Sequence, residues 1–240
     1  MFSPRVLGIL FTALVGIASR SEASIITVPI GLAPGSQYRL VFITNGTYTA
    51  ASASISTYNN DITNEVAAIP QLAALGATWT AIGSTESVSA ATNIGFSAST
   101  VGIYLLDGTT KVANGTGTTG SGLFSGSILN PLNLDDLGIT LSSPVVWTGS
   151  NTDGTIDSTH ALGEALPEAG NPQFSNQWLQ ASNGALGTVS FPLYGISSTL
   201  TVPGTPEPGT TILVALGSGL LLLVQRARKM RPSHYSQTDR

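Results

Sequence analysis

The spacing of hydrophobic positions changes along this chain, and near residue 60 it predicts a helix. Apolar residues there recur at steps of three and four, the spacing of one face of an amphipathic helix: Ile55, Tyr58, Ile62, Val66, Ile69 and Leu72. Ser54 stands where a capping residue is expected, and Gly76 stands just beyond Leu75, where a helix over Ile55–Leu75 would end. Pro70 predicts a kink or the start of a second short helix.

The remaining apolar runs between the two ends predict short strands separated by Gly-rich turns. Tyr38–Thr44 (YRLVFIT) is rich in β-branched and aromatic residues and predicts a buried strand. Further strands are predicted at Thr78–Ser84, Val101–Leu106, Pro144–Gly149, Ser190–Ser198 and Thr199–Val202. One main N-terminal helix followed by several short strands is typical of an α+β domain. A plain β-sandwich is the alternative, and the helix counts against it.

The N-terminus has the three parts of a secretory signal peptide. Arg5 precedes an apolar run from Val6 to Ala18, and small residues follow it. Ser21 and Ala23 occupy the positions that signal peptidase recognises, so cleavage is expected between Ala23 and Ser24. We therefore predict a signal peptide over residues 1–23, with a retained membrane helix as the alternative.

A second apolar run lies near the C-terminus, from Ile212 to Val224. Its thirteen residues would cover about 20 Å as a helix, less than the roughly 30 Å of a hydrocarbon core. A basic cluster follows the run: Arg226, Arg228, Lys229 and Arg231. Long basic side chains extend the effective span and favour the cytoplasmic side. The pattern predicts a single transmembrane helix over 210–225, a cytoplasmic tail over 226–240 and an extracytoplasmic domain over 24–203.

The composition of that domain excludes several classes of partner and reaction. Between Ser24 and Thr205 there are ten acidic residues and only two basic ones, Arg39 and Lys111, a formal charge of −8. Such a surface cannot neutralise phosphates, so nucleic acid is not an expected partner. Cysteine is absent from the chain, which excludes disulfides, thiolate nucleophiles and Cys-ligated metals.

The C-terminal segment carries a motif as well as a hydrophobic run. Pro206, Glu207 and Pro208 lie in a motif over 204–209 and are predicted to be extended, because prolines fix φ and cannot donate to a helix. Pro-Glu-Pro, an apolar helix and a basic end resemble the PEP-CTERM sorting signal of Gram-negative bacteria. The resemblance implies recognition by exosortase, an integral-membrane protease, and an association with extracellular polysaccharide. It also implies transient anchoring in the inner membrane, followed by transfer to the cell surface or extracellular matrix.

A second resemblance concerns the order of elements in the domain. A strand, a helix and a W-x-A strand are followed by spaced motifs: Tyr38–Thr44, Ile55–Leu75, Trp79 with Ala81, Tyr104–Gly108 (YLLDG), Val146–Thr155 (VWTGSNTDGT), Trp178 and Leu193–Ser197 (LYGIS). This order is similar to the C-type-lectin-like fold, in particular to its endostatin-like and bacterial relatives. The resemblance implies that Tyr38–Thr44 pairs with Leu193–Ser197. The family's disulfides and Glu-Pro-Asn sugar motif are absent, so calcium-dependent sugar binding is not implied.

The stretch NTDGTID is the best candidate for a metal site. Asn151, Asp153 and Asp157 could direct oxygen ligands inward around Gly154, and calcium prefers such ligands. The EF-hand pattern is incomplete, because its twelfth position is Leu162. Asn, Asp and Gly are also the residues that an ordinary turn requires, and that reading stays open. No other cofactor is indicated.

No set of residues in the sequence indicates catalysis. His160 is the only histidine before the tail, and the adjacent Asp135 and Asp136 would face opposite ways on a strand. Trp79, Trp147 and Trp178 could stack on sugars, although core packing is their usual role, and Trp178 is expected to be the most exposed. We therefore expect a non-enzymatic adhesion or binding module, with a secreted polysaccharide-active hydrolase as the alternative.

Overall fold

The computed structural model describes residues 25–96, 100–142, 145–182 and 185–204. The predicted signal peptide, sorting motif, transmembrane helix and tail, with Ala23, Ser24, Pro206–Pro208 and the basic cluster, lie outside these residues. Within them, none of the helices combines the length and apolar character that a membrane crossing needs. The described residues form two compact units, 25–30 with 38–200 and 31–37 with 201–204.

The described part of the chain is mixed α and β, with few helices and many short strands. The helices are α1 (Ile55–Ala67), α2 (Pro70–Ala73) and α3 (Ala90–Asn93). The strands are β1 (Gln37–Ile43), β2 (Tyr48–Thr49), β3 (Trp79–Ala81), β4 (Gly102–Tyr104), β5 (Lys111–Asn114), β6 (Val146–Trp147), β7 (Ala169–Gly170), β8 (Ser190–Phe191), β9 (Tyr194–Ser197) and β10 (Leu200–Thr201). The α+β prediction is confirmed at this level.

β1 occupies the centre of the main sheet, whose order is β3-β9-β1-β4-β5. It pairs antiparallel with β9, where Val41 lies opposite Ile196, and parallel with β4, where Arg39 lies opposite Ile103. Every residue of β1 after Gln37 is buried, as expected of a strand covered on both faces. The pairing of Tyr38–Thr44 with Leu193–Ser197, which the lectin-like resemblance implied, is therefore present as β1 with β9.

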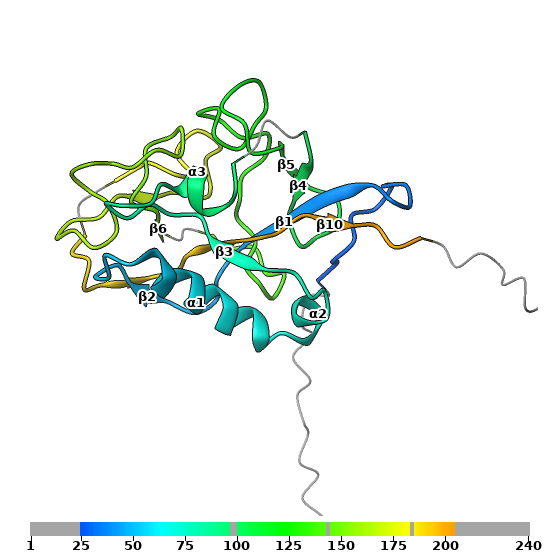
Figure 1. Cartoon of the computed structure of the whole chain (residues 1–240), viewed down its shortest axis with the longest axis horizontal. Coiled ribbons are helices and arrows are strands. Elements are labelled where there is room, and N and C mark those ends of the chain that lie inside the picture. Colours follow the sequence, from blue (N-terminus) through cyan, green and yellow to red (C-terminus); the bar gives the residue numbers. More distant parts are fainter. Residues whose placement is uncertain (1–24, 97–99, 143–144, 183–184, 205–240) are drawn as a thin grey trace, which may run out of the picture. The chain divides into compact units, whose positions relative to one another are not determined.

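The predicted amphipathic stripe is confirmed and packs onto the sheet. Its buried members are Tyr58, Ile62, Val66, Ile69 and Leu72. α1 lies alongside β3, as Figure 1 shows, and the two elements are in contact. Pro70 begins α2 at its first helical position, so the predicted helix over 55–75 is two helices.

All three tryptophans are core residues. The expectation of an exposed Trp178 is wrong, because this side chain is only 1% exposed. Its ring packs against Phe124 and Tyr194, with ring centroids 6.4 and 5.4 Å away. The Tyr194 hydroxyl donates to the Trp178 carbonyl at 2.7 Å. Burial of the indole among aromatic rings removes it as a surface for sugar stacking.

The second unit is a short pairing of two segments. Gly35 donates its N–H to the Val202 carbonyl at 3.0 Å, and Val202 donates to the Ser36 carbonyl at 2.9 Å. Gly35 has φ +82°, a conformation that favours glycine and lets the chain turn before β1.

Candidate functional site

Two carboxyl groups meet where the turn after β1 faces α1. The Asn45 N–H donates to Asp136 Oδ1 at 3.2 Å, and the next N–H, from Gly46, donates to Glu65 Oε1 at 2.7 Å. The Tyr48 hydroxyl donates to Glu65 Oε2 at 2.5 Å. Neighbouring amides of one turn thus bind the two carboxyls. The side chains of Glu65 and Asp136 are also hydrogen-bonded to each other. We call these two residues the carboxyl pair.

The carboxyl pair holds a proton. Asp136 is 1% exposed. Burial, together with the hydrogen bond to Glu65 and the charges of Glu65 and Asp135, raises the pKa of Asp136 to about 8. Burial also acts to raise the pKa of Glu65, but hydrogen bonds from Tyr48, Asp136 and Gly46 outweigh it and lower that pKa. One proton between the two groups therefore persists at neutral pH.

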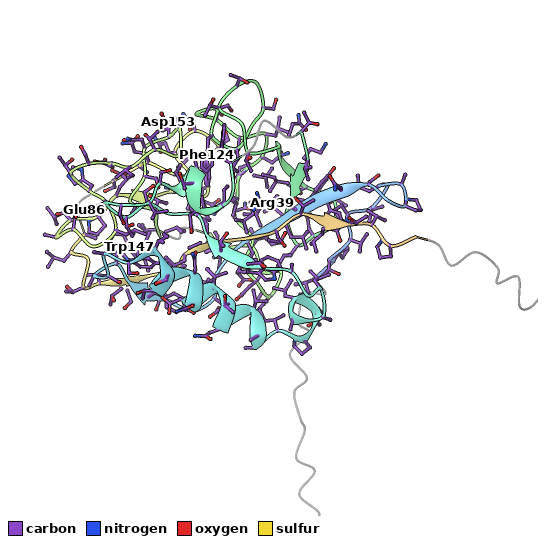
Figure 2. The ribbon with its side chains drawn as sticks, in the orientation of Figure 1. Arg39, Glu86, Phe124, Trp147 and Asp153 are labelled. Carbon is purple, nitrogen blue, oxygen red and sulfur yellow. The ribbon has the colours of Figure 1, made fainter. Side chains whose placement is uncertain are left out.

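No basic side chain of the described residues neutralises the pair. The Arg39 guanidinium donates to the backbone carbonyls of Ser197 and Ile94, at 2.6 and 3.0 Å. Arg39 is a residue of β1 and is labelled in Figure 2. The Lys111 ammonium lies 5.4 Å from the centre of the Tyr104 ring. The shared proton, rather than a cation, is what allows the two carboxyls to lie together.

Asp136 also lines a cavity of about 150 Å³. The other lining residues are Ile25, Ala68, Ile69, Pro70, Gln71 and Leu137. A glycosidase needs its two carboxyls about 5–10 Å apart across a cleft that holds a sugar. Glu65 and Asp136 are hydrogen-bonded to each other rather than separated across a cleft, so they do not match that geometry.

The three predicted calcium ligands each serve a turn. Asp153 Oδ1 accepts from the Thr155 N–H at 3.0 Å and from the Thr155 hydroxyl at 2.6 Å. Asn151 Nδ2 donates to the Ile156 carbonyl at 2.9 Å. Asp157 Oδ1 accepts from the Thr159 N–H at 3.0 Å. Asp153 is exposed in the loop-rich part of its unit (Figure 2). These bonds are what turn-forming Asn and Asp residues usually make.

Asp157 belongs to a different group, with His160 and Glu168. Their ligand atoms all lie within 4.8 Å of one another, and His160 Nδ1 is 3.3 Å from Asp157 Oδ1. Glu168 is buried, and its Oε1 accepts from the N–H groups of Ala181 and Ser182 at 2.9 and 2.8 Å. Within the described ranges these are the residues placed to share a divalent cation. Sequence reasoning missed Glu168, because nothing local connects it to Asp157.

A pocket of about 250 Å³ presents chemistry suited to a neutral sugar. Its lining residues are Phe96, Thr100, Asn114, Gly117, Thr118, Thr119 and Gly122. Phe96 is 47% exposed, and none of the lining side chains is charged. An aromatic face with hydroxyl and amide groups around it can stack on and hydrogen-bond to a sugar ring. We call this the Phe96 pocket. Sequence reasoning looked for tryptophan and missed it.

Comparisons with known proteins give no family for this chain. It matches no protein-family model, and no curated protein is similar to it in sequence. A function for the chain therefore has to come from its own motifs and geometry.

Proposed function

We propose that this chain is an exported cell-surface or matrix protein of a Gram-negative bacterium, sorted by a PEP-CTERM signal. The observation that carries the proposal is the order of three features: Pro206–Pro208, the apolar run Ile212–Val224 and the basic cluster from Arg226 to Arg231. A signal peptide over 1–23 at the other end supports export. Signal peptidase and an exosortase-type protease are the implied processing partners, with the inner membrane as a transient anchor.

The domain over 24–203 serves as a non-enzymatic binding module of C-type-lectin-like shape. The antiparallel pairing of β1 with β9 and the helix that follows β1 support this fold. The Phe96 pocket supports a ligand class, because an uncharged lining with one exposed ring suits a neutral polysaccharide. The direct contact between Glu65 and Asp136 disfavours the alternative of a polysaccharide hydrolase.

The sorting proposal is tested by intact-mass spectrometry of the protein from its native host, in separated membrane and extracellular fractions. The expected form begins at Ser24, ends near Pro206–Pro208 and is found outside the cell. Recovery only in membranes, with the C-terminus intact through Arg240, would refute sorting by cleavage.

The binding proposal is tested with the host's own extracellular polysaccharide. Phe96→Ala should weaken binding about tenfold, which corresponds to roughly 1.4 kcal/mol. Phe174→Ala is the matched control, because Phe174 is 52% exposed and does not line the pocket. Equal binding by both variants would contradict the assignment of the pocket. Release of reducing ends by the unmodified protein would favour the hydrolase.

A further inference from the structure

Three asparagines of this chain directly precede a glycine: Asn45, Asn114 and Asn183. An asparagine in this position can lose its side-chain amide without an enzyme, because the backbone nitrogen of the next residue can attack the carboxamide carbon. Glycine is the most permissive next residue, since it has no Cβ to hinder that approach. Asn183 lies outside the described residues, so the structure distinguishes between Asn45 and Asn114.

The Asn45–Gly46 pair is held by hydrogen bonds on several sides. The Gly46 N–H, whose nitrogen would attack, donates to Glu65 Oε1 at 2.7 Å. The Asn45 N–H donates to Asp136 Oδ1 at 3.2 Å, and the Gly46 carbonyl accepts from the Thr44 hydroxyl at 2.7 Å. Attack on the Asn45 side chain requires the bond to Glu65 to break, and hydrogen bonds to a carboxylate are among the stronger ones.

The reacting groups of the Asn114–Gly115 pair have no such restraint. Asn114 is the last residue of β5, and its exposed side chain makes no hydrogen bond to another described residue. The Gly115 N–H likewise donates to no described residue, whereas the Gly115 carbonyl accepts from the Leu123 N–H at 2.8 Å. Both the attacking nitrogen and the carboxamide that it attacks are therefore without hydrogen bonds to the described part of the chain.

Asn114 also lines the Phe96 pocket, whose lining side chains are all uncharged. We propose that Asn114 is a site of spontaneous deamidation, and that the carboxylate formed there weakens the binding of polysaccharide in the Phe96 pocket. The inference rests on the proposed function, because it concerns the regulation of the same pocket.

The reaction is balanced with water as its co-reactant. The Gly115 nitrogen forms a bond to Cγ of Asn114 and gives its proton to solvent, while Nδ2 takes up a proton and leaves as ammonia. Water then opens the five-membered imide at either of its carbonyls, which gives aspartate or its β-linked isomer. Either product carries a carboxylate where the pocket had a neutral amide.

The new charge has no cation beside it in the pocket, because no lysine or arginine is among the lining residues. A neutral sugar that enters must displace water from the carboxylate, and an acidic polymer is repelled by it. The reaction needs no enzyme and therefore continues after export. The affinity of the pocket for polysaccharide thus falls as the protein ages.

The modification is tested on the full chain recovered from its host and kept in neutral buffer at the host's growth temperature. Peptide mapping by mass spectrometry should show conversion of Asn114 at least about tenfold faster than that of Asn45, a difference in barrier of about 1.4 kcal/mol. Equal rates, or faster conversion of Asn45, would overturn the inference. This measurement uses no ligand, so its result is independent of the proposed polysaccharide binding.

The effect on binding is tested with Asn114→Asp, which carries the charge of the product, and the host's extracellular polysaccharide. This variant should bind about tenfold more weakly than the unmodified chain. Asn64→Asp is the control for the change of net charge, because Asn64 is exposed on α1 and does not line the pocket. The unmodified chain should lose affinity in step with conversion of Asn114. Asn114→Gln should lose none during the same period, because its longer side chain closes the ring much more slowly.

Phe96→Ala separates a failure of the inference from a failure of the proposed function. Unchanged binding by Asn114→Asp, together with weakened binding by Phe96→Ala, would refute the regulation and leave the pocket assigned. Unchanged binding by both variants would refute the pocket itself, and the regulation with it.

Discussion

Asp136 is buried beside a second carboxyl group, that of Glu65, because two backbone N–H groups of one turn bind the two side chains. The neighbouring N–H groups of Asn45 and Gly46 each donate to one carboxyl, which places Asp136 against Glu65. The two hydrogen bonds satisfy both N–H groups of this partly exposed turn, and they offset part of the repulsion between two like charges. A proton between the carboxyls removes the repulsion and keeps both amides satisfied.

This arrangement predicts that the stability of the domain depends on pH. Asp136 has an ordinary pKa of 3.8 and a folded pKa of about 8, so the folded state binds its proton more tightly. The contribution of Asp136 is therefore full below pH 3.8 and is lost as the pH rises to about 8. We expect the free energy of unfolding in urea to fall by on the order of 2 kcal/mol across that range.

The Asp136→Asn variant isolates the effect, because an asparagine amide does not titrate. Its unfolding free energy should lack this fall between pH 4 and 8. Asp153→Asn is the control for a change of net charge at an exposed carboxyl. Parallel pH profiles for the unmodified chain and Asp136→Asn would show that residue 136 is not the titrating group.

At the scale of secondary-structure elements, the side chain of Asn59 connects α1, β3 and α3. Asn59 on α1 accepts from the Ala81 N–H of β3 at 2.9 Å. Asn59 and Asn93, the last residue of α3, exchange side-chain hydrogen bonds at 2.9 Å, and Asn93 Nδ2 also donates to the Ala81 carbonyl at 2.8 Å. The apolar stripe determines which face of α1 is buried. The hydrogen bonds of Asn59 and Asn93 then fix the position of α1 against Ala81 at the end of β3.

Removal of the network should therefore cost more than an ordinary surface change. We expect Asn59→Ala to lower the free energy of unfolding by about 1–3 kcal/mol, because the Ala81 N–H and Asn93 lose a partner. Asn64→Ala on the exposed side of α1 is the matched control and should stay within about 0.5 kcal/mol. Urea unfolding of both variants measures the difference, and equal losses would show that the network adds no stability.

The lengths of the elements follow local chemistry only in part. Pro70 was sufficient to predict the break between α1 and α2. The strand predicted over Ser190–Ser198 is instead β8 and β9, separated by Pro192 and Leu193. Proline has no N–H for the ladder, and its carbonyl accepts from the Trp147 N–H at 3.0 Å, so this point of the chain bonds outside the main sheet.

At the scale of the larger unit, stability should be greatest around β1. β1 is buried and bonded on both sides, by β9 and by β4, whereas residues 115–122 form a loop with exposed threonines. Amide hydrogens open by local and global unfolding, and the best protected ones report the global event. We expect β1 and β9 amides to exchange at least about a hundredfold more slowly than those of residues 115–122. Hydrogen exchange followed by mass spectrometry measures this, and similar rates in both segments would contradict a central role for β1.

Local pattern was sufficient for the α1 stripe, the buried β1 strand, the α+β class and the exclusion of cysteine chemistry. Each of these depends on residue type or on neighbours a few positions apart, where the periods of helix and strand operate. Tertiary contact alone brought Glu65 to Asp136, placed Glu168 with Asp157, buried Trp178 and left Phe96 exposed. The reason is physical: burial, pKa and ligand geometry depend on residues distant in sequence, and no period along the chain records which of them will meet.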